Sequence, residues 1–235
     1  MNKTKNSCDV KSCFLCQGCV PDWLQLVAIH KKNFSFKKGE NIFTEGQPIE
    51  GIYFLYQGKV KVHKQWGQEK ELIIRFAMDG DIVGHRGFGS NTTYPVSATA
   101  LEPTIICFID LDFFLSTLKM NPELTYKLML FYARELQGAE HRMRNLVHMD
   151  MKGRIADSLL ILKNQFGVDE EGNIDIVISR QDLASFAGTS YESIFRIMNE
   201  LVNDGIIEAR EKKIKITNEP QLQAYTVATA KEGSI

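Results

Sequence analysis

The sequence predicts an α+β protein with a β-rich first half, one long helix and a small winged helix-turn-helix domain near its carboxyl end. Three observations predict this class: glycine-punctuated alternating segments up to about residue 110, a helical period from residue 111, and a helix-turn-helix spacing near residue 190. A chain of 235 residues with 44% hydrophobic and 24% charged residues suits two folded domains. The predicted parts are a cysteine-rich segment (1–33), a β-roll (34–120), a long helix (121–150), a winged helix-turn-helix domain (151–218) and a weakly ordered tail (219–235).

The β-sheet prediction depends on short alternating segments. They are FSFKKGENIFTEG, GIYFLYQGKVKVHK, ELIIRFAMDGDIVG and SATALEPTIICFID. Glycines separate them at the spacing of one strand and one turn, which is typical of an all-β barrel or jelly roll. We therefore expect a β-roll of the sensor type between residues 34 and 120.

A long helix is predicted between the break at Asn121-Pro122 and His148. Apolar residues recur within it at spacings of three and four, as in the seam of a coiled coil: Met129, Tyr132, Leu136, Ala139, Met143 and Leu146. This pattern predicts a homodimer with Leu136, Ala139, Met143 and Leu146 in its interface. The alternative is a helix packed wholly onto its own domain.

Residues 179–201 have the spacing of two short helices joined by a tight turn at Gly188. Ser179 is the expected N-cap of the first helix, and Thr189 or Ser190 that of the second. Buried positions are expected at Leu183, Ala184, Ala187, Ile194, Ile197, Met198 and Leu201. After Gly205 the pattern predicts a two-stranded wing. The alternative is a plain helical hairpin that binds nothing.

The outward face of the second helix predicts contact with double-stranded DNA. It carries Tyr191, Glu192, Phe195 and Arg196, and a helix held in this way can enter a major groove. Arginine can pair with guanine, glutamate can accept from a cytosine amino group, and Phe195 can press on a thymine methyl group. An ion pair between Glu192 and Arg196 on a solvated helix is the alternative. Phosphate contacts are expected from Ser179, Thr189, Ser190 and the wing residue Lys212.

The charge balance neither supports nor excludes DNA as a partner. The formal net charge is −1, and residues 152–216 hold nine Lys and Arg against eleven Asp and Glu. Contact with DNA must therefore depend on local placement of cations. No apolar run has the length of a membrane span, and the first ten residues lack the apolar core of a secretory signal, so we expect a cytoplasmic protein without membrane contact.

Five cysteines predict a metal centre. Cys8, Cys13, Cys16 and Cys19 lie close together, and Cys107 follows far downstream on a predicted strand. In a cytoplasmic chain such clustering favours metal over disulfides, and the two Cys-x-x-Cys steps resemble those of bacterial ferredoxins.

Other uses of the same cysteines are open. Structural zinc would use the first four cysteines and leave Cys107 as a buried core residue. A thiol redox protein would use Cys13 and Cys16. That pair does not lie in a βαβ unit, however, and the chain shows no phosphate-binding glycine loop, paired-carboxylate motif or nucleophile elbow. We therefore expect a protein that is not an enzyme.

The motifs together resemble the CRP/FNR transcription regulators. KKGENIFTEGQPIEGIYFLYQGKVKV resembles the opening of that family's β-roll, DGDIVG its central hairpin, RIADSLL the start of its DNA-binding domain, and SRQDLASFAGTSYESIFRIMNEL its recognition motif. The cysteines resemble those of the FNR-like branch, which has a cluster ahead of the β-roll and one cysteine within it. The family's close spacing is one pair two apart and then a longer gap, so the spacing here departs from it.

The resemblance implies a homodimeric regulator that binds an inverted-repeat operator and works with RNA polymerase. It places Glu192 and Arg196 at base-contacting positions. It also implies an iron–sulfur cluster, of the [4Fe-4S] type, on Cys13, Cys16, Cys19 and Cys107, with Cys8 as a possible substitute. The expected signal is oxygen, nitric oxide or redox state.

The same resemblance argues against cyclic AMP as the effector. Cyclic-nucleotide binders of the family use a Glu and an Arg in this hairpin, where this chain has His85 and the stretch Tyr94-Pro95-Val96. A buried phosphate would lack its cationic partner. Haem or another small effector in the β-roll, without an iron–sulfur cluster, is the alternative; the candidate haem ligands are His30, His63, His85, His141 and His148.

Overall fold

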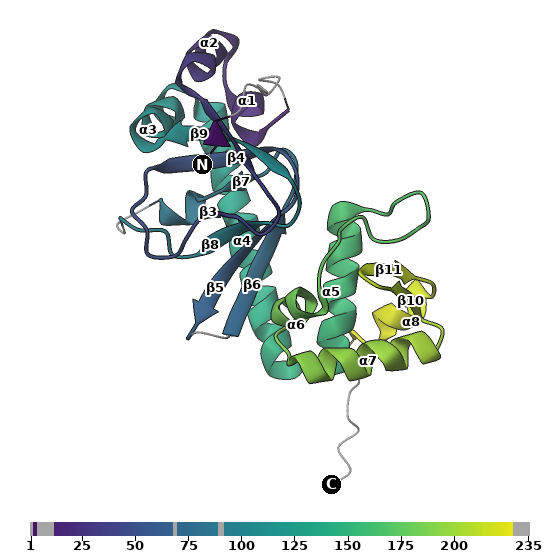
Figure 1. Cartoon of the computed structure of the whole chain (residues 1–235). Coiled ribbons are helices and arrows are strands. Elements are labelled where there is room, and N and C mark those ends of the chain that lie inside the picture. The colour runs from purple at the N-terminus through teal and green to yellow at the C-terminus, as the bar shows by residue number, and fades with distance from the viewer. Residues whose placement is uncertain (1, 4–11, 68–69, 89–91, 228–235) are drawn as a thin grey trace. The chain divides into compact units, whose positions relative to one another are not determined.

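The computed structural model describes residues 2–3, 12–67, 70–88 and 92–227, and divides into two compact units. The first is Met1–Leu136 and the second Gln137–Ile235. Figure 1 shows both units in chain order, from purple at the amino end to yellow at the carboxyl end. None of the described helices is long and apolar enough to cross a membrane.

The first unit is a β-roll with helices at one end, as predicted. Its described elements are β1 (Asn2–Lys3), α1 (Phe14–Gly18), α2 (Pro21–His30), β2 (Lys32–Phe36), β3 (Asn41–Phe43), β4 (Gly51–Gln57), β5 (Val60–Trp66), β6 (Lys70–Ala77), β7 (Ile82–Val83), η1 (His85–Gly87), β8 (Ser97–Ala100), β9 (Thr104–Asp110) and α3 (Leu111–Met120). Antiparallel strands form one sheet in the order β1-β2-β9-β4-β7 and another in the order β3-β8-β5-β6.

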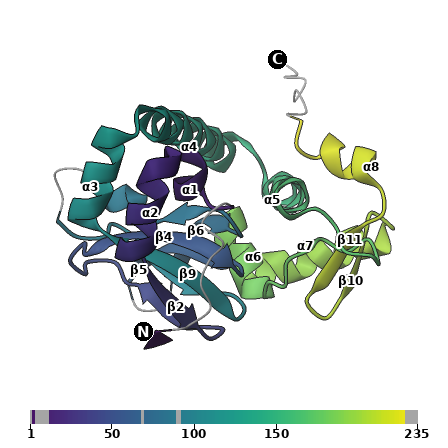
Figure 2. The same cartoon turned by 90° about the horizontal axis from the view of Figure 1, so that it is seen from above.

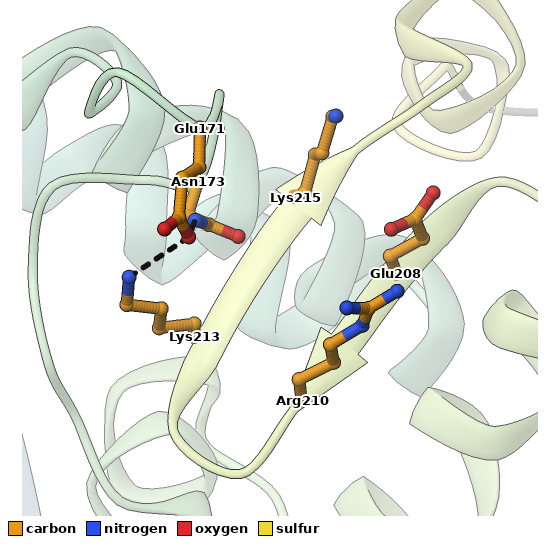
Figure 3. Close-up of a pocket in the computed structure, with 6 residues that line it drawn as sticks. All are labelled: Glu171, Asn173, Glu208, Arg210, Lys213 and Lys215. Carbon is orange, nitrogen blue, oxygen red and sulfur yellow. Dashed lines mark hydrogen bonds and ion pairs between the residues drawn. The ribbon is translucent and has the colours of Figure 1, made fainter.

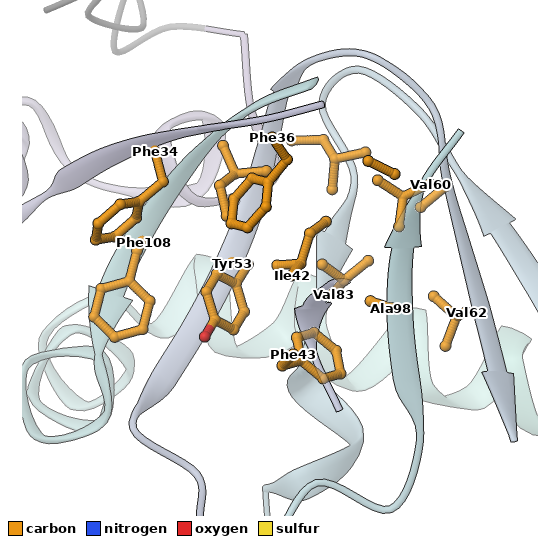
Figure 4. Packing of buried hydrophobic residues seen from close by; sticks show 14 of the residues in the cluster. Phe34, Phe36, Ile42, Phe43, Tyr53, Val60, Val62, Val83, Ala98 and Phe108 are labelled. Atoms are coloured by element: carbon orange, nitrogen blue, oxygen red, sulfur yellow. The ribbon is translucent and has the colours of Figure 1, made fainter. Parts of the chain in front are cut away.

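Strands β4 and β9 separate two hydrophobic cores because their side chains alternate in direction. Tyr53 and Leu55 of β4 join the core between the sheets, which Figure 4 shows in part. Ile52 and Phe54 lie in the other core, which contains side chains of α1 to α3. These helices gather beside β4 and β9 in Figures 1 and 2. Both faces of β4 are therefore buried, which explains its continuous apolar sequence.

Helix α4 (Pro122–His148) belongs to both units, which divide at Leu136. The second unit continues with α5 (Met151–Phe166), α6 (Arg180–Ala187), α7 (Tyr191–Asn203), β10 (Ile207–Arg210), β11 (Lys213–Ile216) and α8 (Glu219–Ala224). Strands β10 and β11 pair antiparallel and form the predicted wing. The chain breaks between α4 and α5, and Asp150 is the N-cap of α5: its side chain accepts a hydrogen bond from the Gly153 amide.

The prediction of a weakly ordered tail was wrong for its first part. Asn218 caps α8, and Leu222 is fully buried in the second unit. Lys163 of α5 also forms an ion pair with Glu219. The folded unit thus extends beyond residue 218. The proline at position 220 suggested the end of ordered structure, but proline is favourable in the first turn of a helix, and the cap and the buried leucine stabilise a short one here. Residues 228–235 lie outside the described part of the chain.

Candidate functional site

Two helix caps and one glycine build the helix-turn-helix. Ser179 and Asp182 form a reciprocal capping box on α6, and Ser190 caps α7 by accepting from the Ser193 amide. Gly188 lies between them with a φ of 63°, in the left-handed region. A Cβ on Gly188 would lie 2.5 Å from a methyl carbon of Leu146. The left-handed backbone conformation therefore favours glycine here, whereas the Leu146 methyl group is the far end of a half-exposed side chain that can move aside.

Helix α7 presents its polar and aromatic side chains to solvent. The predicted buried residues Ile194, Ile197, Met198 and Leu201 are buried, whereas Tyr191, Glu192, Phe195 and Arg196 are exposed. Phe195 is 56% exposed, which is a large apolar surface for a side chain with no packing role. A one-sided helix of this kind can lie against an extended partner.

The alternative ion pair between Glu192 and Arg196 is not the one that the structure contains. Arg196 Nη1 instead lies 2.6 Å from Glu200 Oε1, one turn toward the carboxyl end of α7. Hydrogen bonds from its own backbone and from the Ser190 side chain lower the pKa of Glu192. Both candidate base-reading residues thus carry charge in separate surroundings.

The three predicted phosphate-binding hydroxyls lie in different surroundings. The Ser179 hydroxyl donates to Asp182 Oδ2 at 2.6 Å and accepts from the Asp182 amide at 2.9 Å, so it stabilises the helix end. The Thr189 hydroxyl oxygen is buried and has no hydrogen-bond partner among the described residues. Ser190 is exposed. In this conformation Ser190 is the hydroxyl that a phosphate can reach.

The wing carries cations on one face, shown in Figure 3. The cross-strand pairs Glu208–Lys215 and Arg210–Lys213 share this face, and they line a shallow cavity of about 280 Å³ with Glu171 and Asn173. Lys213 Nζ lies 3.0 Å from Glu171 and 3.5 Å from Asp169, and these contacts raise its pKa. The predicted contact Lys212 is exposed at the wing turn.

Arg154 positions the turn of the motif, and sequence reasoning missed it. From α5 its guanidinium donates to the carbonyl oxygens of Ala187 at 3.1 Å, Gly188 at 3.3 Å and Met149 at 2.8 Å. It therefore bonds the otherwise unpaired carbonyls at the end of α6 and fixes the turn to α5. The only sequence signal was its place inside the RIADSLL motif.

Four cysteines lie in or against the core that α1 shares with the sheet. Cys13, Cys16 and Cys107 are buried members of this core, and Cys19 packs against it. All four are thiols. Burial and the nearby Cys13 raise the pKa of Cys19 to about 11. Cys8 lies outside the described residues.

The segment that carries these cysteines is anchored on two sides. The Phe14 amide donates to the Gly80 carbonyl at 2.9 Å, and the Val20 amide donates to Asn121 Oδ1 at 2.8 Å. A Cβ on Gly18 would lie 2.6 Å from a methyl carbon of Leu124, so this helix packs closely on the start of α4. Over the described residues, no three His, Cys, Asp or Glu side chains are grouped as ligands of one metal ion.

The region around His85 is filled by the chain's own charges. Glu135 of α4 lies 2.5 Å from Arg86 and 3.4 Å from Arg75, while Arg75 also donates to the Ile82 carbonyl at 2.7 Å. Tyr132 donates to the His85 carbonyl at 2.6 Å. Burial, with Arg75 and Arg86 nearby, holds the pKa of His85 well below its usual value. His85 is therefore a neutral imidazole in the packed interior of this unit.

The remaining position from the cyclic-nucleotide comparison is also packed. Tyr94 is buried, stacks on Phe43 with ring centroids 4.3 Å apart, and donates to the Gly51 carbonyl at 2.7 Å. It borders a cavity of about 240 Å³ whose lining, among the residues that the structure describes, includes Gln47, Glu50 and Tyr53 and no arginine or lysine. His63, another candidate haem ligand, is buried between Thr99 and Glu71, each 2.8 Å from a ring nitrogen.

The predicted dimer seam on α4 divides into two sets of residues. Leu136 and Met143 are more than 60% exposed, and Met129 lies one heptad earlier on the same exposed row. Tyr132 faces its own unit and bonds to His85, and Ala139 is half-buried. Leu146 is 46% exposed and also lies close to Gly188. Further exposed apolar residues on this helix are Tyr126, Leu130 and Val147.

Comparison with known proteins follows the same two-part division. Residues 33–121 match the cyclic nucleotide-binding domain, and residues 153–225 match the Crp-like helix-turn-helix domain. The chain belongs to the CRP/FNR family of transcription regulators. This membership confirms the predicted fold class and the expectation that the protein is not an enzyme. The matched DNA-binding domain also includes α8.

Individual CRP/FNR relatives differ in what their names say about the signal. The transcriptional activator protein anr of Pseudomonas aeruginosa is 28% identical over 91% of both chains. The CRP-like cAMP-activated global transcriptional regulator of Mycobacterium tuberculosis is 24% identical over 88% of this chain and 93% of its own. The structure of FixK2 from Bradyrhizobium japonicum covers 85% of this chain and 99% of its own, with a TM-score of 0.75 at 24% identity. The effector must therefore be inferred from the site.

Proposed function

We propose that this CRP/FNR-type regulator binds an inverted-repeat operator as a homodimer, with one α7 helix in each of two successive major grooves. The observation that carries the proposal is the two-sided character of α7, whose inner face is fully buried and whose outer face is exposed and mixed in chemistry. Tyr191, Glu192, Phe195 and Arg196 are the proposed base-reading residues, and Ser190 and Lys212 the proposed phosphate contacts. RNA polymerase is the proposed protein partner.

The exposed row of α4 supports the homodimer. Leu136 and Met143 are left exposed by the described residues of their own chain, and they repeat at the heptad spacing of a two-helix seam. Ala139 and Leu146 complete the proposed interface. Two copies of α7 then follow the twofold axis, which predicts half-sites about one helical turn apart. Selection from random duplexes tests this: an enriched palindrome is expected, and enrichment of single half-sites would contradict the dimer.

We propose further that cysteines of the first unit hold an iron–sulfur cluster through which oxygen, nitric oxide or redox state controls DNA binding. The donor set fits this group, because four thiols from the α1 segment and from β9 lie in or against one core. Cys13, Cys16, Cys19 and Cys107 would hold a [4Fe-4S] cluster, which needs four thiolates rather than four ligands around one ion, as zinc does. When bound, such a cluster supplies a covalent link that oxidants can break.

The chain's own residues define what that link would join. Cys13 begins α1, and Cys19 follows its end, whereas Cys107 lies on the central strand β9. The thiols would lose their protons on ligation, and the raised pKa of Cys19 makes this costly without a metal. A reactive redox thiol needs a lowered pKa, so the raised pKa of Cys19 makes this thiol unsuited to redox catalysis.

The ion cluster at Glu135 argues against cyclic AMP as the effector. Arg75 and Arg86 already pair with one carboxylate inside the roll, and Tyr94 fills the position where a phosphate-binding arginine was expected. A cyclic nucleotide phosphate would have to displace Glu135 and leave that carboxylate without partners.

Strictly anaerobic purification tests the cofactor. We expect a brown protein with iron and sulfide that bleaches in air, and Cys107→Ser should abolish cluster binding. Thr104→Ser, on the same strand, is the matched control and should keep its iron. A Soret band would replace the proposal with haem, and an equal iron content in Cys107→Ser would exclude Cys107 as a ligand.

A further inference from the structure

The geometry points to Glu200 as a positioning residue for sequence discrimination: it holds the guanidinium of Arg196 in the orientation that reads one base pair. This inference deepens the proposed DNA-binding function and rests on it. Glu200 lies in the carboxyl-terminal half of α7, away from the end that enters a groove first, so its contribution acts through Arg196.

The carboxylate of Glu200 bridges two cations from different helices. One oxygen, Oε1, lies 2.6 Å from Arg196 Nη1, and the other, Oε2, lies 3.9 Å from Lys152 Nζ on α5. Lys152 is itself fixed, because its Nζ lies 3.5 Å from Asp204 and 4.5 Å from the ring centroid of Tyr225. The recognition arginine is therefore connected to α5 and to the segment after α8 through one acidic side chain.

The shape of the guanidinium explains how this contact assists base reading. Arginine has five N–H donors in a planar fork, and a guanine takes two of them at O6 and N7. Because Glu200 occupies Nη1, the edge formed by Nη2 and Nε is left for the base. A guanidinium that is already oriented also loses less side-chain freedom on binding.

Pairing with Glu192 instead would have the opposite effect. Glu192 lies one turn toward the amino end of α7, where its carboxylate accepts hydrogen bonds from the Ser190 side chain and from its own backbone. An ion pair between Glu192 and Arg196 would occupy both proposed base-reading groups. Glu200 instead holds the Arg196 side chain toward the carboxyl end of α7, so Glu192 and Arg196 remain available for different base pairs.

Glu200→Ala and Glu200→Gln remove the same charge, but glutamine keeps an oxygen that can accept from Arg196. Asp204→Asn is the matched control. Asp204 lies at the same helix end and contacts Lys152 but not Arg196, so this variant removes one carboxylate without affecting the contact under test. Each variant is titrated as the full-length dimer against the selected palindrome, a duplex changed at each single base pair, and random duplex. Thermal unfolding checks the fold.

We expect discrimination at the base pair read by Arg196 to fall about three- to fivefold in Glu200→Ala and less in Glu200→Gln. Discrimination elsewhere and the unfolding temperature should stay unchanged, and Asp204→Asn should retain the wild-type ratio. Unchanged discrimination in Glu200→Ala, or an equal loss in Asp204→Asn, overturns the inference. If no palindrome is enriched at all, the proposed function fails first, which separates the two results.

Discussion

The residues proposed to carry function lie in or beside hydrophobic cores in the first unit and on the solvent-exposed surface in the second. In the first unit the cysteines, His85 and the Arg75–Glu135 contact lie inside or at the edge of packed cores. In the second unit Arg196 and Phe195 lie on an exposed face of α7, outside the hydrophobic core of that unit. A sensor domain has to change its own packing, whereas a DNA-recognition surface has to contact another molecule.

This difference predicts how mutations divide between stability and function. A polar group buried in the first unit contributes to folding as well as to any proposed role in signalling, because leaving its partner uncompensated is costly. An exposed group in the second unit contributes little to folding, so its loss shows only when DNA is present. Three measurements test this division, beginning with the largest expected effect.

Glu135→Gln should destabilise the first unit by about 2–3 kcal/mol, because two largely buried arginines lose their shared carboxylate. Hydrogen exchange of amides in β4 and β9 measures this free energy within the unit. Glu123→Gln, an exposed residue of the same helix, is the control and should change it by less than about 0.5 kcal/mol. A loss no larger than the control's would mean that water compensates the cluster.

Arg196→Ala should weaken binding to the selected operator by about 1–3 kcal/mol and leave the unfolding temperature unchanged. Fluorescence anisotropy against operator and random duplex gives the two affinities. An equal loss on both duplexes would show that the arginine contacts only the backbone. A large drop in unfolding temperature would contradict the division between the units, because the exposed face would then support the core.

Local patterns determined much of this fold. Short segments separated by glycines predicted the strands β4 and β9, although both are more continuously apolar than alternating, and the spacing of Ile194 to Leu201 predicted the buried face of α7. The wing after Gly205 also followed from short-range signals. These elements were accessible because each depends on residues within a few positions of one another.

Contacts between distant residues could not be predicted in the same way. Arg75 and Glu135 are far apart in the chain, and no period connects them. Arg196 had a carboxylate one turn away on either side, and only the structure shows that it pairs with Glu200, which also lies near Lys152 of another helix. The strand pattern placed Cys107 on a strand, whereas its place in the same core as Cys13 and Cys16 was suggested only by the family resemblance.

The smallest expected effect concerns the charge cluster of Glu71, His63 and Lys61 on the β-roll. Glu71 is only partly buried, so it lies between the buried groups of the first unit and the exposed groups of the second. Burial raises the pKa of Glu71, but hydrogen bonds from His63 and Lys61 outweigh it and lower the pKa to about 2. A depressed carboxyl pKa stabilises the folded state above the unfolded value, near 4.5, and this contribution is lost as pH falls from 4.5 toward 2. Glu71→Gln should therefore flatten the acid limb of the stability curve by about 1–2 kcal/mol. Denaturant titrations between pH 7 and pH 2 measure it, and an acid limb as steep as that of the wild type would show that this half-buried pair behaves like an exposed one.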